Sequence, residues 1–174
     1  MTTLDDTQWL EFEANGFLRL GRELSDAELA ALQQRIDDIM LGKADVDYDR
    51  MLMQLDGNVD RDRMKQVMEG ETEQDDYCTA YPQSNGHKGA TLNYRKIQDL
   101  EYDPVYLEYL SRPLFRGICN HVYGTGRRIA IYRAMLMNKP AGAGSYLPWH
   151  HDRWAELDRD PLITVWTALD PATR

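Results

Sequence analysis

The sequence predicts an α+β fold in which helices come first and strands follow. Two observations support this order. Apolar residues recur at helical spacing in 24–42 and 103–124, whereas β-branched, aromatic and methionine residues dominate 128–139 and 162–169. The length of 174 residues and the hydrophobic content of 43% suit a sizeable core. We therefore expect a single domain over 1–174.

The N-terminal part predicts two helices with a short strand between them. Residues 9–14 favour a short helix, and the alternation in 16–20 is typical of a strand. The longer helix starts after Ser25, where Ser25 and Glu28 have the spacing of a capping box, and its apolar stripe ends before Gly42. From 43 to 89 the chain is acidic and methionine-rich without a period, which predicts an irregular connection or lid.

The second half predicts two more helices and two strands. The apolar pattern of 103–124 is helical; Pro113 suits the first turn of a second helix and Gly124 its C-terminal cap. Residues 128–139 then form a long predicted strand that Pro140 ends, and 162–169 form another.

Composition limits the partners and the compartment. The formal charge of -9 repels nucleic-acid phosphates and anionic membranes, so neither nucleic acid nor a membrane is expected as a partner. Cys78 and Cys119 lie far apart, which is typical of reduced thiols in a reducing compartment. No apolar run is long enough for a membrane span and no leader follows Met1, so we expect a cytoplasmic protein.

The tetrapeptide His150-His151-Asp152-Arg153 carries the clearest chemistry. In an extended segment residues two apart project from one face, so His150 and Asp152 can bind one metal ion while His151 points away. A histidine and a carboxylate are two of the three ligands of the facial triad that binds non-haem iron. His87 and His121 are isolated, and we expect structural or solvated roles for both.

Five segments in order resemble the phytanoyl-CoA dioxygenase family of Fe(II)- and 2-oxoglutarate-dependent oxygenases. They are residues 12–20 with the following helix, Lys96-Ile97-Gln98-Asp99, Met135-Leu136-Met137-Asn138-Lys139-Pro140, residues 147–152, and Val165-Trp166-Thr167-Ala168-Leu169.

The resemblance implies a double-stranded β-helix, also called a jelly roll or cupin-like barrel, behind N-terminal helices. It implies that His150 and Asp152 bind iron and that Lys96, Met135 and Trp166 line the 2-oxoglutarate pocket. The implied reaction uses dioxygen to hydroxylate an unactivated C–H bond of a small organic substrate. His151 and Arg153 are candidates for contact with that substrate.

The chemistry of the pocket residues agrees with this implication. Lys96 offers a cation for a dicarboxylate, while Met135 and Trp166 offer apolar walls for its methylene groups. In a continuous strand Arg133 shares the face of Met135, so an inward Met135 requires an inward Arg133 with an anionic partner.

The sequence departs from the family pattern downstream of Leu169. The strands that carry the family's second iron-binding histidine and an arginine for 2-oxoglutarate have no counterpart here. We therefore expect that the C-terminal half of the barrel is missing from this chain and that a second chain or a missing segment completes it. Two alternatives remain open: a non-catalytic, degenerate oxygenase module, and a cupin-type metal hydrolase or isomerase.

Overall fold

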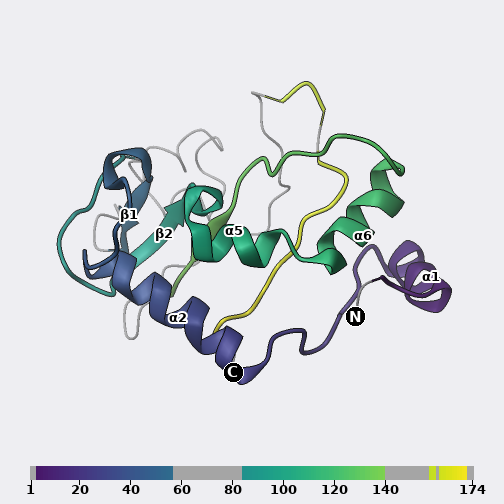
Figure 1. Ribbon diagram of the computed structural model, residues 1–174, viewed down its shortest axis with the longest axis horizontal. Helices are drawn as coiled ribbons and strands as arrows, with labels where there is room; N and C mark the ends of the chain where they lie inside the picture. The colour runs from purple at the N-terminus through teal and green to yellow at the C-terminus, as the bar shows by residue number, and fades with distance from the viewer. Residues whose placement is uncertain (1–2, 57–83, 140–156, 160, 172–174) are drawn as a thin grey trace, which may run out of the picture. The chain divides into compact units, whose positions relative to one another are not determined.

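The computed structural model describes residues 3–56, 84–139, 157–159 and 161–171 (Figure 1). These residues form two compact units. The helical unit contains the described residues of Met1–Gln34, Pro104–Ile131 and Asp152–Arg174, and the sheet unit contains those of Arg35–Asp103 and Tyr132–His151. The combination of helices with a small antiparallel sheet agrees with the predicted α+β class.

Both N-terminal helices begin with the side-chain caps that their sequences encode. Helix α1 (Asp6–Asn15) starts at a capping box in which Asp5 accepts a hydrogen bond from the Gln8 backbone at 2.8 Å. Helix α2 (Asp26–Met40) starts at the predicted box, where Glu28 accepts from the Ser25 backbone at 2.8 Å. Each box satisfies N–H groups that the first helical turn leaves unpaired. The predicted helices at 9–14 and 25–40 are therefore confirmed.

The described part of the helical unit contains two further helices. Helix α5 (Pro104–Leu110) and helix α6 (Pro113–Tyr123) lie where the sequence predicts them, with Pro113 in the first turn of α6 and Gly124 at its end. The buried Tyr106 hydroxyl donates to the Leu32 carbonyl at 3.1 Å, which ties α5 to α2.

Residues 162–169 do not form the predicted strand. The described part of this segment has no strand, and its polar groups bond to side chains of the helical unit instead. The Leu162 N–H donates to the Tyr123 hydroxyl at 3.0 Å, and the Gln33 amide donates to the Leu169 carbonyl at 2.7 Å. The segment 16–20 is also irregular, because an alternating run becomes a strand only when another strand pairs with it.

The described residues of the sheet unit include three antiparallel strands in the order β1-β2-β3. They are β1 (Met53–Leu55), β2 (Tyr94–Gln98) and β3 (Met135–Met137). Strand β1 and the short 3-10 helix η1 (Tyr48–Arg50) lie inside the segment that was predicted to be irregular. The predicted strand at 128–139 is wrong for most of its length, because only β3 pairs with β2.

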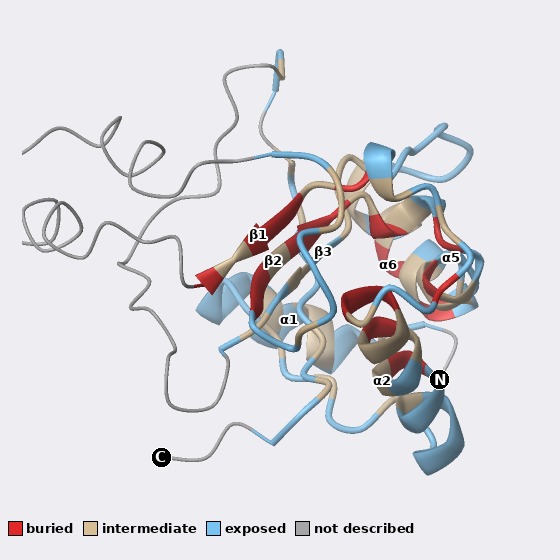
Figure 2. Ribbon diagram, turned by 90° about the vertical axis from the view of Figure 1, so that its left-hand side faces the viewer, coloured by how far each residue is buried: buried red, intermediate tan, exposed pale blue. Residues whose placement is uncertain are grey.

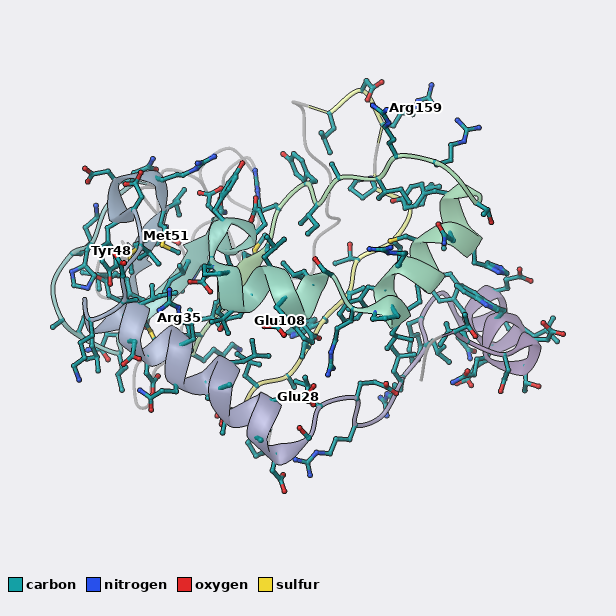
Figure 3. The ribbon with its side chains drawn as sticks, viewed as in Figure 1. Glu28, Arg35, Tyr48, Met51, Glu108 and Arg159 are labelled. Atoms are coloured by element: carbon teal, nitrogen blue, oxygen red, sulfur yellow. The ribbon has the colours of Figure 1, made fainter. Side chains whose placement is uncertain are left out.

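Among the three strands, the residues of β1 and β2 are mostly buried and those of β3 are the most exposed (Figure 2). Arg35, which projects from α2 (Figure 3), pairs with the buried carboxylate of Asp103 at 2.7 Å. Asp103 ends η3 (Leu100–Tyr102), the 3-10 helix that follows β2. A buried carboxylate needs such a partner, so this ion pair fixes the chain where β2 leaves the sheet. The buried apolar residues of the unit are Ile36, Ile39, Met40, Ala44, Met51, Met53, Tyr94, Ile97 and Leu100.

The C-terminal end of α2 closes against His87. Gly42 has a φ of +70°, and the Lys43 N–H returns to the Asp38 carbonyl at 2.8 Å, as in a Schellman cap. One ring nitrogen of His87, Nε2, lies 3.0 Å from the Met40 carbonyl, while Nδ1 accepts from Gly89 N–H at 3.2 Å. Nε2 is therefore the protonated nitrogen, and it caps the helix. No described helix has the length and apolar character needed to cross a bilayer.

Candidate functional site

Away from the register shift at Gln54 and Leu55, the two faces of the described sheet differ in character. Met53 and Leu136 pair with Ile97 on either side of it, and this row forms the apolar face. Ile97 and Met53 are fully buried. Successive residues of a strand point to opposite faces, so the neighbours of this row form the other side. We call this second side the polar sheet face; its residues are Gln54, Lys96, Gln98, Met135 and Met137.

Lys96 and Met135, two of the residues predicted to bind 2-oxoglutarate, lie together on the polar sheet face. Lys96 pairs with Met137, and Gln98 pairs with Met135. Lys96 and Met135 are therefore diagonal neighbours, a relation that separates Cα atoms by about 7–8 Å and lets long side chains meet. The side chains of Met135 and Met137 remain 37% and 41% exposed. A cation and two soft apolar groups thus lie side by side.

The polar sheet face also holds deeply buried amides. Gln54 is 4% exposed and Gln98 is 5% exposed. Strand β1 is irregular between Gln54 and Leu55, and at this bulge Arg95 donates to the Gln54 side-chain oxygen at 2.8 Å. Bulges redirect side chains in this way. Nε2 of Gln98, in contrast, is buried and has no hydrogen-bond partner among the residues that the structure describes.

Backbone contacts fix β3 in register with β2. Ala134 accepts from the Leu100 N–H at 3.2 Å and donates its own N–H to the Glu101 carboxylate at 3.0 Å. After β3, the Asn138 N–H donates to the Arg95 carbonyl at 2.8 Å. Contacts on both sides of a three-residue strand prevent the slip that would move Met135 to the other face.

Arg133 does not follow Met135 to the polar sheet face as a continuous strand requires. It precedes the start of β3. Its guanidinium group donates to the Tyr132 hydroxyl at 3.2 Å and lies 5.0 Å from the centre of that ring. The expectation that Met135 and Arg133 point inward together therefore does not hold, because the chain between them leaves the ladder.

Trp166 belongs to the helical unit, and its side chain is 88% exposed. The neighbouring Thr167 is anchored by a hydrogen bond between its hydroxyl and that of Tyr109. Burial raises the pKa of Tyr109, because its phenolate is poorly solvated there. The role of Trp166 in the 2-oxoglutarate pocket stays a prediction.

The predicted metal ligands His150 and Asp152, together with His151 and Arg153, lie outside the described residues. Within the described ranges no three His, Cys, Asp or Glu side chains come together to hold a metal. His121 stacks on Trp9 with ring centres 3.7 Å apart. With the helix cap at His87, this confirms the structural roles expected for the two isolated histidines.

The thiol of Cys119 is free. Burial raises its pKa, so little reactive thiolate is present at neutral pH. Cys78 lies outside the described residues, so the reduced state of both thiols stays a prediction.

Sequence reasoning missed Gln98, although the signal for it was present. The segment Lys96-Ile97-Gln98-Asp99 places Gln98 two positions after Lys96, and residues two apart in a strand share a face. Its burial was not predictable, because a glutamine in a short strand is more often solvated.

The described residues fit an acidic co-substrate. One face carries a lysine, two methionines and a buried donor that has no partner within the described ranges, and these groups offer positive charge, apolar contact and hydrogen bonding to one small molecule. These are the properties that a short dicarboxylic acid with a methylene chain requires.

Comparison with known proteins identifies the family. No curated protein and no solved structure matches the chain. The family model described as phytanoyl-CoA dioxygenase (PhyH) matches residues 12–174. This match covers both units, so the chain belongs to the phytanoyl-CoA dioxygenase family, within the superfamily of Fe(II)- and 2-oxoglutarate-dependent oxygenases.

Proposed function

We propose that this protein is an Fe(II)- and 2-oxoglutarate-dependent dioxygenase that hydroxylates an unactivated C–H bond of a small organic substrate. The proposal is supported most directly by the sheet register. Lys96 and Met135 come from distant parts of the sequence, and the pairing of β2 with β3 brings them to one face. A co-substrate pocket requires this proximity, and a solvated lysine in an unrelated fold does not.

The proposal assigns each residue a role. His150 and Asp152 hold the iron, Lys96 neutralises a carboxylate of 2-oxoglutarate, and Met135 and Trp166 cover its methylene groups. The strands β1, β2 and β3 are then part of a jelly roll whose interior is the polar sheet face. When bound, iron would supply a site at which dioxygen acts as the oxidant: one oxygen atom would enter the C–H bond to give C–OH, and the other would enter the succinate that forms with carbon dioxide from 2-oxoglutarate.

The chain's own residues orient and shield this chemistry. The ammonium group of Lys96 holds an anion in place through a charge-assisted hydrogen bond, and the methionines beside it exclude water. Asp152 occupies a coordination position with a carboxylate, which favours hydroxylation over halogenation. His151 and Arg153 are assigned to the substrate side.

The test is an anaerobic titration of the full-length protein with Fe(II) and 2-oxoglutarate, followed by admission of oxygen. We expect a weak visible charge-transfer band that needs both additions, and succinate once oxygen enters. Absence of both the band and succinate would sink the proposal.

A matched pair of lysine variants assigns the co-substrate contact. Lys96→Ala is expected to weaken 2-oxoglutarate binding about 10- to 100-fold, because a hydrogen bond to a charged group contributes about 1.5–3 kcal/mol. Lys43→Ala removes the same charge from an exposed position and leaves the affinity unchanged. Equal effects of the two substitutions would point to general electrostatics instead of a contact. An activity that survives Lys96→Ala unchanged would favour a cupin-type hydrolase or isomerase.

A further inference from the structure

The Gln98 side chain is the one buried group of the polar sheet face whose donor lacks a partner among the described residues. It is 5% exposed, and its amide nitrogen Nε2 has no acceptor there. Buried donors are almost always satisfied in folded proteins, because an unmade hydrogen bond leaves the desolvation of the group uncompensated. Such a group indicates a bound molecule that completes it.

Gln54 provides the contrast on the same face. It is the same residue type with nearly the same burial, 4% against 5% exposed. Its side-chain oxygen is bonded to Arg95 at 2.8 Å, so the protein itself supplies a partner at that position. Packing on this face therefore does not force a glutamine to remain unsatisfied, and Gln98 differs for a local reason.

The location of Gln98 indicates the kind of molecule. Gln98 pairs directly with Met135 and lies two residues from Lys96, on the same face as both. Its neighbours are therefore a cation, which selects an anion, and a methionine, which selects an apolar chain. An amide N–H needs an acceptor oxygen, and a dicarboxylic 2-oxo acid has both acceptor oxygens and a methylene chain.

We propose that Gln98 is a further co-substrate-binding residue whose side-chain amide donates a hydrogen bond to an oxygen of 2-oxoglutarate. This assignment rests on the proposed function. It adds a neutral donor to the charge of Lys96, and a neutral donor fixes the orientation of an anion without adding to its long-range attraction.

The experiment measures 2-oxoglutarate binding to the full-length protein loaded with Mn(II), by isothermal titration calorimetry, for wild type and Gln98→Met. Methionine keeps the size and removes the donor. The dissociation constant is expected to rise about 10- to 100-fold, the loss for a hydrogen bond to a charged group. An unchanged dissociation constant overturns the assignment of Gln98. If the wild type itself does not bind 2-oxoglutarate, the proposed function fails, which is a different result.

Stability without ligand separates a binding role from a structural one. Gln98→Met removes an unsatisfied donor, so the midpoint of urea unfolding without ligand is expected to stay the same or rise. Gln54→Met breaks the bond to Arg95, so its midpoint falls. A fall of the Gln98→Met midpoint without any loss of affinity shows a structural glutamine and overturns the proposal.

A charged variant gives an independent check. Gln98→Glu keeps the shape but places a carboxylate against the carboxylate or keto oxygen of the ligand. Its affinity loss at neutral pH is expected to exceed that of Gln98→Met and to shrink as the pH falls and the new carboxyl group is protonated. A loss that is independent of pH contradicts a direct contact.

Discussion

The residues of the candidate site and its surroundings come together in pairs that are far apart in the sequence. Lys96 and Met135 meet only through the β2–β3 register, and Gln54 and Arg95 meet only at the irregularity of β1. Gln98 lies on the same sheet face, but its amide nitrogen has no partner within the described part of the chain. Gln98 is therefore a candidate binding residue alongside Lys96, although only Lys96 matches a co-substrate-binding position of the family.

The metal ligands give the sharpest residue-scale prediction. His150→Ala and Asp152→Ala in the full-length protein are expected to weaken Fe(II) binding by more than about 100-fold, since even residues that only support metal ligands cost about 10- to 100-fold. His151→Ala is expected to retain Fe(II), because alternate residues of an extended segment face opposite ways. Competition with a chelator under anaerobic conditions measures all three. Equal losses would refute the ligand assignment.

At the scale of elements, the end of α2 is held by two interactions at a single glycine. The helix stops at a glycine with positive φ, and the ring of His87 packs on that glycine while it caps the helix. Two interactions thus depend on the absence of one side chain. The junction also sets where the segment toward η1 and β1 begins.

Substitution of Gly42 tests this junction. A Cβ at Gly42 lies 3.1 Å from the His87 ring, so Gly42→Ala both strains the backbone and displaces the cap. Gly21→Ala is the control, since Gly21 has a φ of +76° but nothing within 4 Å of its Cβ position. Both variants are expected to lose about 1–2 kcal/mol of the free energy of unfolding, because alanine is strained in the left-handed backbone conformation. Gly42→Ala is expected to cost about 1 kcal/mol more, the value of the weakened hydrogen bond.

Urea unfolding of the two glycine variants measures this difference. Gly42→Ala should have the lower unfolding midpoint. Equal free energies of unfolding would mean that the His87 ring moves aside without cost and that its hydrogen bond to Met40 contributes nothing.

On the scale of the whole molecule, helices were more predictable than strands. The ends of α2 and α6 are predictable from cap residues that lie next to them in the sequence. These residues are Ser25, Glu28, Pro113 and Gly124. Strand β1 has no such local signal, since its pairing partner β2 lies far along the chain. The strand predicted at 162–169 was wrong although its apolar pattern is present. No strand pairs with this segment in the described part of the chain, and side chains of the helical unit bind its backbone groups instead.

The candidate site divides in a similar way. The resemblance to the family was sufficient to select Lys96 and Met135, and the register of β2 with β3 places both on one sheet face. The burial of Gln98 and the bond between Gln54 and Arg95 depend on the bulge and on tertiary packing, which no local pattern encodes. The roles of His150, Asp152 and Trp166 stay predictions.

Alkaline pH should lower the free energy of unfolding of both units. Burial raises the pKa of Tyr94 in the sheet unit and of Tyr109 in the helical unit. The unfolded chain then releases these protons at lower pH than the folded protein does. The stability from the neutral phenols is therefore complete below about pH 10 and is lost as the pH rises through the folded pKa values.

Two tyrosine variants isolate this effect. The urea midpoint of the wild type is expected to fall as the pH rises above about 10, the ordinary pKa of tyrosine, and Tyr94→Phe should reduce the slope of that fall because it removes one titrating group. Tyr102→Phe is the control, because Tyr102 is 58% exposed. If the two variants had the same slope, Tyr94 would not contribute to the alkaline transition.

Strand β2 carries the apolar contact of Ile97 on one face and the candidate binding groups Lys96 and Gln98 on the other. The five residues of β2 are therefore constrained both by packing on one face and by the proposed binding on the other. A random library over this strand should yield few functional members, because a change on either face moves the other. Substitutions intended to change substrate specificity are better placed elsewhere in the chain, at positions that do not combine packing with binding.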